Sequence, residues 1–339
     1  MESTKRKNAV IQIKKAFLIS LRTLAVCLLF SVCMAVGVAL SGLDRVAKQG
    51  DTAQPSSQTS PETAPAVPGS PPTQPRAQAS PSSLFIPFLA FSVCVGSVVS
   101  YLILRSSGHG WMLAGAVFVG MYGISTVVSQ IESIVFLSSK LPHGMVWAIF
   151  VQGAIATALF APLAVLVLGK WRAAMPAAVA PAPERMRVAS AARRLALLII
   201  AFVFLYMFFG YYVAWQNPEV RKYYGGPEWP SFFAALKGNW LNSHWIYPLA
   251  SFRALLYVAF VFPLIRMLRV ARWESAMATA LFLSAWTTML LLPNPLMPAS
   301  VARSHFWETL GFSLVFGTLL GWLLNTPSSA IAKNTQESP

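Results

Sequence analysis

The sequence predicts an all-α, polytopic membrane protein with about eight transmembrane helices. Of its 339 residues 56% are hydrophobic and only 11% are charged, and the mean hydropathy is +0.58. Soluble domains carry about 25% charged residues. Apolar runs of about 20 residues recur along the chain, and each is long enough to cross a hydrocarbon core of about 30 Å as a helix. Lipid is therefore expected to be the main solvent of this fold.

The predicted membrane helices, in chain order, cover 17–40, 84–104, 111–137, 145–168, 195–215, 245–265, 274–292 and 304–324. Most of the 26 basic residues fall before the first segment or between alternate pairs of segments. Because cytoplasmic loops retain Lys and Arg, we expect the N-terminus and the C-terminus in the cytoplasm. The expected location is the cell membrane, in a bacterium the inner membrane.

The formal net charge of +15 follows from this topology. It also predicts an attraction to anionic headgroups, so membrane lipids are expected partners. The basic residues are dispersed over several segments and form no continuous stripe, and no nucleic-acid partner is expected.

Residues 1–40 are expected to form a basic N-terminus followed by an uncleaved first membrane helix. Cys33 could be a lipoprotein acceptor, but Phe30-Ser31-Val32 before it makes a poor lipobox, and the apolar run is long for a signal peptide. Cys27 and Cys94 also fall in predicted membrane helices, where the cysteines are expected to pack as small apolar residues.

Three segments interrupt the helices. Residues 41–83 are rich in Pro, Ser and Thr and are expected to form a disordered outer linker, because they cannot bury enough apolar surface to fold. Residues 169–194 are expected to be a basic inner linker between membrane helices two to four (84–168) and five to eight (195–324), and 325–339 a polar C-terminal tail. No internal repeat is evident in the sequence, which disfavours a duplicated transporter fold.

The outer segment 216–244 is aromatic. Asn217-Pro218 supplies a helix start and Gly225-Gly226 a stop, which predicts a short helix over 217–224. From Pro230 onward, apolar residues recur at helical spacing and predict a second helix lying in the membrane interface. This segment is interpreted either as an aromatic belt or as a lid over a ligand site.

Ionisable residues at membrane depth are the best candidates for function, because each is costly unless it is paired or hydrated. In the third predicted helix, Tyr122, Ser125, Ser129 and Glu132 share one face. Arg253 lies well inside the sixth. At about 1.5 Å per residue, Glu132 is about 8 Å and Arg253 about 12 Å from the outer helix ends, so the two charges are expected to face each other.

His305 and Glu308 share a face near the outer end of the last predicted helix. Glu132, Arg253, Glu308 and His305 are therefore the candidate substrate-binding residues. Two other interpretations stay open: the Glu132–Arg253 pair is a structural lock, or His305 and His244 bind a metal with Glu308. The metal interpretation is weak because no HExxH spacing is present, so no metal or cofactor is expected and no catalytic residue is assigned.

Small residues recur on the same helix at every fourth position, as Ser313, Gly317 and Gly321, and predict close packing against another helix. Three functional classes remain open. The preferred class is a binding or transport protein with an outward-facing polar cavity for a small-molecule or lipid ligand. The alternatives are a membrane-embedded enzyme acting on a lipid or lipid-linked substrate, and a structural or partner-assembly protein; whether the chain is an enzyme is left open.

Overall fold

The computed structural model describes residues 2–46, 81–138, 141–172, 188–225, 230–294 and 297–325. Within these ranges the regular structure is helical, apart from an isolated antiparallel bridge between Ser106 and Leu268. Seven helices are long and apolar enough to cross a membrane. The chain is therefore a multipass membrane protein with an all-α fold.

The first group of helices occupies residues 2–172. It comprises α1 (Glu2–Ser41), α3 (Pro81–Arg105), α4 (Gly110–Tyr122), the π-helical segment η1 (Gly123–Val128), α5 (Ser129–Leu137) and α6 (Met145–Val167). Helix α1 begins well before the predicted segment 17–40, because residues 2–16 contain no Gly or Pro that would stop a helix. Most of the predicted outer linker, residues 47–80, lies outside the described residues.

The second group occupies residues 188–325. It comprises α7 (Val188–Phe209), the π-helical segment η2 (Gly210–Ala214), α8 (Pro218–Tyr224), α9 (Phe232–Asn242), α10 (Ile246–Met267), α11 (Arg272–Thr287), the 3₁₀ segment η3 (Thr288–Leu291) and α12 (Ala299–Leu324). The predicted segment 274–292 is an α-helix of 16 residues and then η3, so it is not among the seven candidate spans.

The start of α7 corrects the sequence prediction. Helix α7 begins at Val188, earlier than 195, because Ala and Arg residues that favour a helix precede the apolar run. The C-terminal part of the predicted inner linker is therefore helical, while 173–187 and the tail 326–339 lie outside the described residues.

Both short helices of the aromatic segment are confirmed. The Asn217 side chain accepts a hydrogen bond from the Glu219 backbone N–H at 2.9 Å and caps α8. Gly225 ends α8 with a φ of 73°, a left-handed conformation that glycine adopts at little cost. Ser231 is the N-cap residue of α9, although its side chain makes no capping hydrogen bond.

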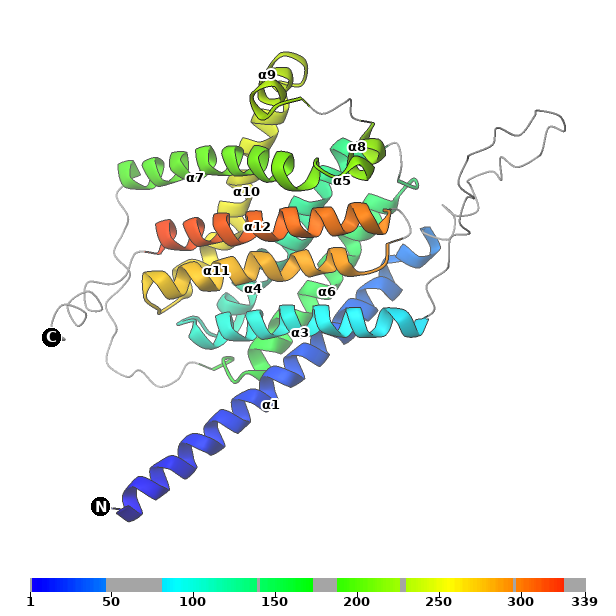
Figure 1. Cartoon of the computed structure of the whole chain (residues 1–339). Helices are drawn as coiled ribbons and strands as arrows, with labels where there is room; N and C mark the ends of the chain where they lie inside the picture. The colour runs from blue at the N-terminus through cyan, green and yellow to red at the C-terminus, as the bar shows by residue number, and fades with distance from the viewer. Residues whose placement is uncertain are drawn as a thin grey trace.

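The long helices form two packed layers (Figure 1). One layer contains α7, α12, α11 and α3 in that order, and the other contains α10, α4 with α5, α6 and α1. Helices α1 and α3 join the layers at one side, and α7 and α10 join them at the other. The helices therefore follow one another around the bundle as α1, α6, α4, α10, α7, α12, α11, α3 and back to α1.

This order repeats itself, which corrects the expectation that the chain has no internal repeat. When α1, α3, α4–α5 and α6 are exchanged with α7, α10, α11 and α12, respectively, each pair of helices that is adjacent in this ring maps onto another adjacent pair. The first half of the repeat is residues 2–172 and the second half is 188–325. An even number of helices per half gives both halves the same direction through the bundle.

The loops between helices support the duplication. The α3–α4 and α10–α11 loops pair with each other: Ser107 N–H donates to Met267 O at 2.7 Å, and Arg269 N–H donates to Arg105 O at 3.2 Å. The residues around these loops also match at constant spacing, as the pairs Leu102/Leu264, Ile103/Ile265, Trp111/Trp273, Ala114/Ala276 and Ala116/Ala278.

The residues after the last helix of each half make corresponding contacts. Lys170 Nζ donates to Ser106 O at 2.8 Å in the α3–α4 loop. Asn325 Nδ2 donates to Val270 O at 3.2 Å in the α10–α11 loop. Each half therefore ties its own C-terminal end to its own short loop in the same way.

Each half has a buried phenylalanine at its centre. Phe30 of α1 packs edge-on against Phe160 of α6, with ring centroids 5.2 Å apart. Phe202 of α7 packs edge-on against Phe316 of α12 at 5.0 Å. All four of these rings are almost completely buried.

Close contact between α11 and α12 confirms the predicted small-residue stripe. A Cβ atom added to Gly317 would lie 2.6 Å from Ala280 Cα, and one added to Gly321 would lie 2.5 Å from Ser275 O. Only glycine permits this approach, so α11 lies directly along α12.

The two ends of the bundle differ in composition. Arg105, Lys170, Arg269 and Arg272 lie where α3, α6 and α10 end and α11 begins, and we call this the basic end. Helices α8 and α9 lie at the other, aromatic end (Figure 1). Arg22 of α1 lies beside Gly169 at the basic end, and the N-terminal part of α1 projects beyond the other helices.

Candidate functional site

Glu132 and Arg253 form the predicted ion pair. Glu132 lies in α5, near the aromatic end, and its Oε1 accepts a hydrogen bond from Nη1 of Arg253 in α10. The Arg253 side chain is only 8% exposed, whereas that of Glu132 is 40% exposed. The pair joins the first half of the repeat to the second, because α5 and α10 belong to different halves.

Aromatic rings hold the Arg253 guanidinium in place. Its central carbon lies 5.3 Å from the centroid of the Tyr206 ring and 5.9 Å from that of Phe202. Both rings come from α7, and such cation–π contacts strengthen when the cation is withdrawn from water. Arg253 Nε is buried and has no hydrogen-bond partner among the described residues.

His305 and Glu308 form a second pair in the first turns of α12. His305 Nδ1 and Glu308 Oε2 are 2.6 Å apart, which confirms that these side chains share a face. They are 18% and 15% exposed, and His305 Nε2 is buried without a partner in the described part of the chain. The pair therefore leaves one ring nitrogen for another group.

Helix α7 and η2 connect the two pairs. The Tyr206 ring lies 5.3 Å from the guanidinium carbon of Arg253, and one turn later a Cβ atom on Gly210 would lie 3.5 Å from Glu308 Oε1. The four residues singled out in the sequence thus gather in one region, together with a tyrosine that was not singled out. We call Glu132, Tyr206, Arg253, His305 and Glu308 the polar cluster.

Helix α8 places a further tyrosine over this cluster. Asn217 Nδ2 donates to Ser304 Oγ of α12 at 2.9 Å, which fixes α8 against the start of α12. The Tyr224 ring then packs edge-on against the His305 ring, with centroids 5.6 Å apart. Burial raises the pKa of the Tyr224 phenol, and the Glu132 and Glu308 carboxylates raise it further.

The two π-helical segments lie next to the cluster. Segment η1 ends at Val128, one turn before Glu132, and η2 begins at Gly210, one turn after Tyr206. A Cβ atom on Gly210 would lie 3.5 Å from Glu308 Oε1, so η2 passes close to that carboxylate. Single π turns inside α-helices frequently occur at functional sites.

Segment η1 also changes the predicted polar stripe. The stripe of Tyr122, Ser125, Ser129 and Glu132 assumed 3.6 residues per turn, but the π-helical turn between Tyr122 and Ser129 is wider and shifts the register. The Ser129 hydroxyl donates to Ser125 O at 2.6 Å and is used within its own helix. Of the four residues, Glu132 is the one that reaches the cluster.

Sequence reasoning missed Tyr206 and Tyr224. Tyr206 was one hydroxyl among several inside predicted helices, and Tyr224 belonged to the expected aromatic segment. Tyr206 lies four residues after the buried Phe202 and Tyr224 four residues after the buried Val220, and this helical spacing from an apolar residue is the signal that could have found them.

The described residues contain no group of three or more His, Cys, Asp or Glu side chains that could hold a metal ion. The polar cluster instead combines two carboxylates, a guanidinium, an imidazole and a phenol, which can bind a polar or charged molecule by hydrogen bonds. Comparison of the chain with protein-family models, curated proteins and solved structures finds no match, so the geometry of this cluster is what points to its function.

Proposed function

We propose that this multipass membrane protein binds or transports a small polar molecule or a lipid headgroup at the polar cluster, which the ligand reaches from the aromatic end. The observation that carries the proposal is the meeting of Glu132 and Arg253, from opposite halves of the repeat, at membrane depth. In duplicated transporters, substrate sites lie at the interface between the repeats.

Buried polar nitrogens support a ligand over a closed structural pair. Arg253 keeps its Nε–H and His305 keeps its Nε2 without partners among the described residues. Leaving a buried polar group unsatisfied costs about 1–3 kcal/mol, and more for a charged group. A ligand that forms hydrogen bonds with these two nitrogens would remove that cost.

We further propose that the chain crosses the membrane eight times, with the basic end in the cytoplasm. Helix α11 and η3 together extend alongside α12, and their 20 residues from Arg272 to Leu291 match the length of a crossing. The excess of Lys and Arg at the basic end supports the orientation. In a bacterium, the polar cluster would then open to the outside of the inner membrane.

Two alternative functions, a membrane enzyme and a structural protein, require different features of the site. A membrane enzyme would need a nucleophile beside His305 or Glu308, but the Thr309 hydroxyl donates to His305 O at 2.6 Å and the Ser304 hydroxyl to Ser300 O at 3.1 Å. A structural protein is favoured by the direct contact between Glu132 and Arg253, which by itself would hold the halves together.

Native mass spectrometry of the protein in native-lipid nanodiscs tests the proposal. We expect a retained small molecule or lipid that is lost in His305→Ala and Glu308→Gln. Glu219→Gln is the matched control, because Glu219 is an exposed carboxylate of α8 that accepts a hydrogen bond from Ser300 Oγ outside the cluster. Unchanged retention in both cluster variants would overturn the assignment of the site.

A further inference from the structure

The two halves of the repeat meet along two seams. Helix α4 and segment η1 face α10 along the first seam, where Glu132 of α5 also reaches Arg253, and α3 faces α11 along the second. The two seams correspond to each other, because the exchange of the halves described above pairs α4 with α11 and α10 with α3. Each seam carries an ion pair between the halves, but the two pairs lie at opposite ends of the bundle.

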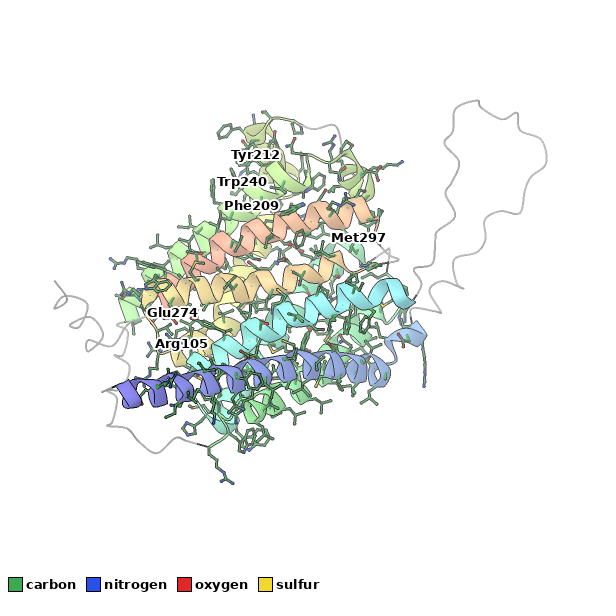
Figure 2. The ribbon with its side chains drawn as sticks, turned by 60° about the horizontal axis from the view of Figure 1, so that its bottom comes forward. Arg105, Phe209, Tyr212, Trp240, Glu274 and Met297 are labelled. Carbon is green, nitrogen blue, oxygen red and sulfur yellow. The ribbon has the colours of Figure 1, made fainter. Side chains whose placement is uncertain are left out.

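Glu132 and Arg253 close the first seam at the aromatic end. At the basic end, Glu274 of α11 closes the second seam: its Oε1 lies 2.5 Å from Arg105 Nη2 and accepts hydrogen bonds from Arg105 Nε at 2.7 Å and from the Tyr101 hydroxyl at 2.5 Å. Figure 2 shows Arg105 and Glu274 side by side at this end. Both pairs are formed in this structure, so both ends are closed.

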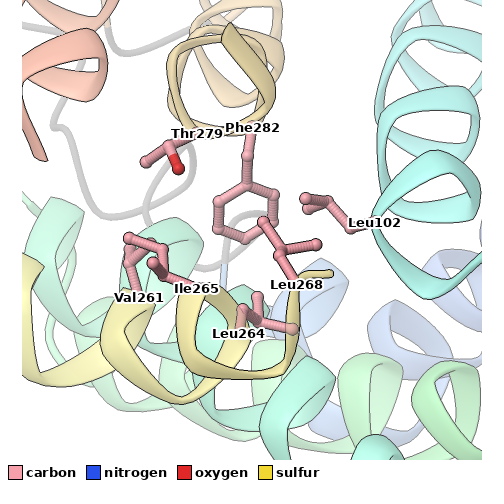
Figure 3. A pocket seen from close by; sticks show the side chains of 7 residues that line it. All are labelled: Leu102, Val261, Leu264, Ile265, Leu268, Thr279 and Phe282. Carbon is pink, nitrogen blue, oxygen red and sulfur yellow. The ribbon is translucent and has the colours of Figure 1, made fainter. Parts of the chain in front are cut away.

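The core between these closures is apolar, with Met121, Val261 and Phe282 buried in it. A narrow crevice with about 170 Å³ of empty space, too narrow for a water molecule, lies on the basic-end side of this core, where Leu268 beside the paired loops lines it. Leu102, Leu264 and Phe282 line it (Figure 3), and Leu102 and Leu264 are counterparts in the two halves. Thr279 is its one polar lining residue, and the Thr279 hydroxyl donates to Ser275 O of its own helix at 2.8 Å.

The side chains of this core meet by dispersion contacts, which have no preferred direction. The polar contacts that a movement of one half against the other would break are concentrated in the two ion pairs and in the paired loops at the basic end. Packed halves with such contacts have discrete arrangements rather than a continuous range.

We propose that the two halves rock against each other about this apolar core, with the Glu132–Arg253 and Arg105–Glu274 pairs as alternating closures. When Glu132 parts from Arg253 the aromatic end opens while Glu274 keeps the basic end shut, and the reverse holds when Glu274 parts from Arg105. This inference rests on the proposed binding or transport function, since parting Glu132 from Arg253 admits a ligand to the polar cluster from the aromatic end while the basic end stays shut.

Double electron–electron resonance distances in full-length protein test the rocking. Trp111→Cys with Trp273→Cys places spin labels at counterpart positions of α4 and α11 at the basic end, where both tryptophans are exposed. Trp147→Cys with Trp307→Cys labels α6 and α12 toward the aromatic end, again at exposed positions. The native cysteines are first replaced by alanine, and this background must keep the thermal stability of the native chain.

The two ion pairs should shift these distances in opposite directions. Glu274→Gln is expected to add a longer component at the basic end and to reduce the longer component at the aromatic end. Glu132→Gln is expected to do the opposite. Glu219→Gln removes a carboxylate that bonds within the second half and should leave both distributions unchanged.

Shifts of the same sign at both ends, shifts confined to the mutated end, or no shift at either end would overturn the rocking. Ligand retention, measured separately by native mass spectrometry, distinguishes this failure from failure of the proposed function. A ligand that is retained by a protein with fixed distances would contradict the rocking alone. Shifts of the two spin-label distances in opposite directions, in a protein that retains no ligand, would contradict the proposed function alone.

Discussion

A double-mutant cycle on Glu132 and Arg253 is the most direct test of how the bundle tolerates charge at membrane depth. Glu132→Gln leaves the guanidinium of Arg253 unpaired in a side chain that is only 8% exposed. Removing one partner of a buried pair typically costs about 3–5 kcal/mol. Because the Glu132 carboxylate is 40% exposed, we expect a loss toward the low end, about 3 kcal/mol.

The electrostatic part of the loss in unfolding free energy should be smaller for Arg253→Gln than for Glu132→Gln. The carboxylate left behind is partly exposed and can be hydrated, so an unpaired Glu132 is penalised less than an unpaired Arg253. The substitution also removes the guanidinium from the Tyr206 and Phe202 rings, a loss of about 0.5–2 kcal/mol. The double variant should recover about 1–3 kcal/mol relative to the sum of the two single changes, as is usual for residues in contact.

Thermal unfolding in nanodiscs, followed by intrinsic tryptophan fluorescence, measures these differences. For a chain of this size, about 1 kcal/mol corresponds to a shift in Tm of roughly 1–2 °C. The exposed-carboxylate variant Glu219→Gln is the control and should stay within about 0.5 kcal/mol. Additive effects of the two single changes would refute the reasoning, because they would show that the pair contributes no coupling free energy.

Three further outcomes are expected. Alkaline-phosphatase fusions within 52–80 should be active and a fusion at Asn334 inactive, and the opposite activity at either position would contradict the orientation. Deletion of 54–79 should leave extraction yield and Tm unchanged, because its composition predicts no packing, and a marked loss of either would show that the segment docks. Gly321→Val should lower Tm by several degrees because its Cβ would meet Ser275 O at 2.5 Å, whereas Gly115→Val, at a glycine with open space, should have a much smaller effect.

The sequence predicted the helices and the charged pair well, because both follow from the cost of exposing polar groups to lipid. Apolar length locates the helices, and two isolated charges at similar depth have few ways to avoid that cost. The same argument placed His305 and Glu308 on one face, since they lie within a single regular helix. These predictions needed no knowledge of tertiary structure.

Features that depend on contacts between distant segments could not be predicted from the sequence. The internal duplication is visible in the order of the helices and in the paired loops at Ser106 and Leu268, while few residues match in the sequence. The π-helical register of η1 changed which residues accompany Glu132. Tyr206 joined the cluster because α7 packs against α10, a neighbour relation that local periodicity cannot supply.

The projecting part of α1 offers a practical route to imaging this protein. Helix α1 has 40 residues and is about 60 Å long, roughly twice the thickness of a hydrocarbon core. The part of α1 on the N-terminal side of Arg22 is an uninterrupted helix that extends away from the other helices (Figure 1). A helical partner protein fused in register to the N-terminal end of α1 would continue this helix without a flexible linker. The fused partner would add mass outside the membrane, and particle alignment in electron cryomicroscopy requires such mass for a small membrane protein.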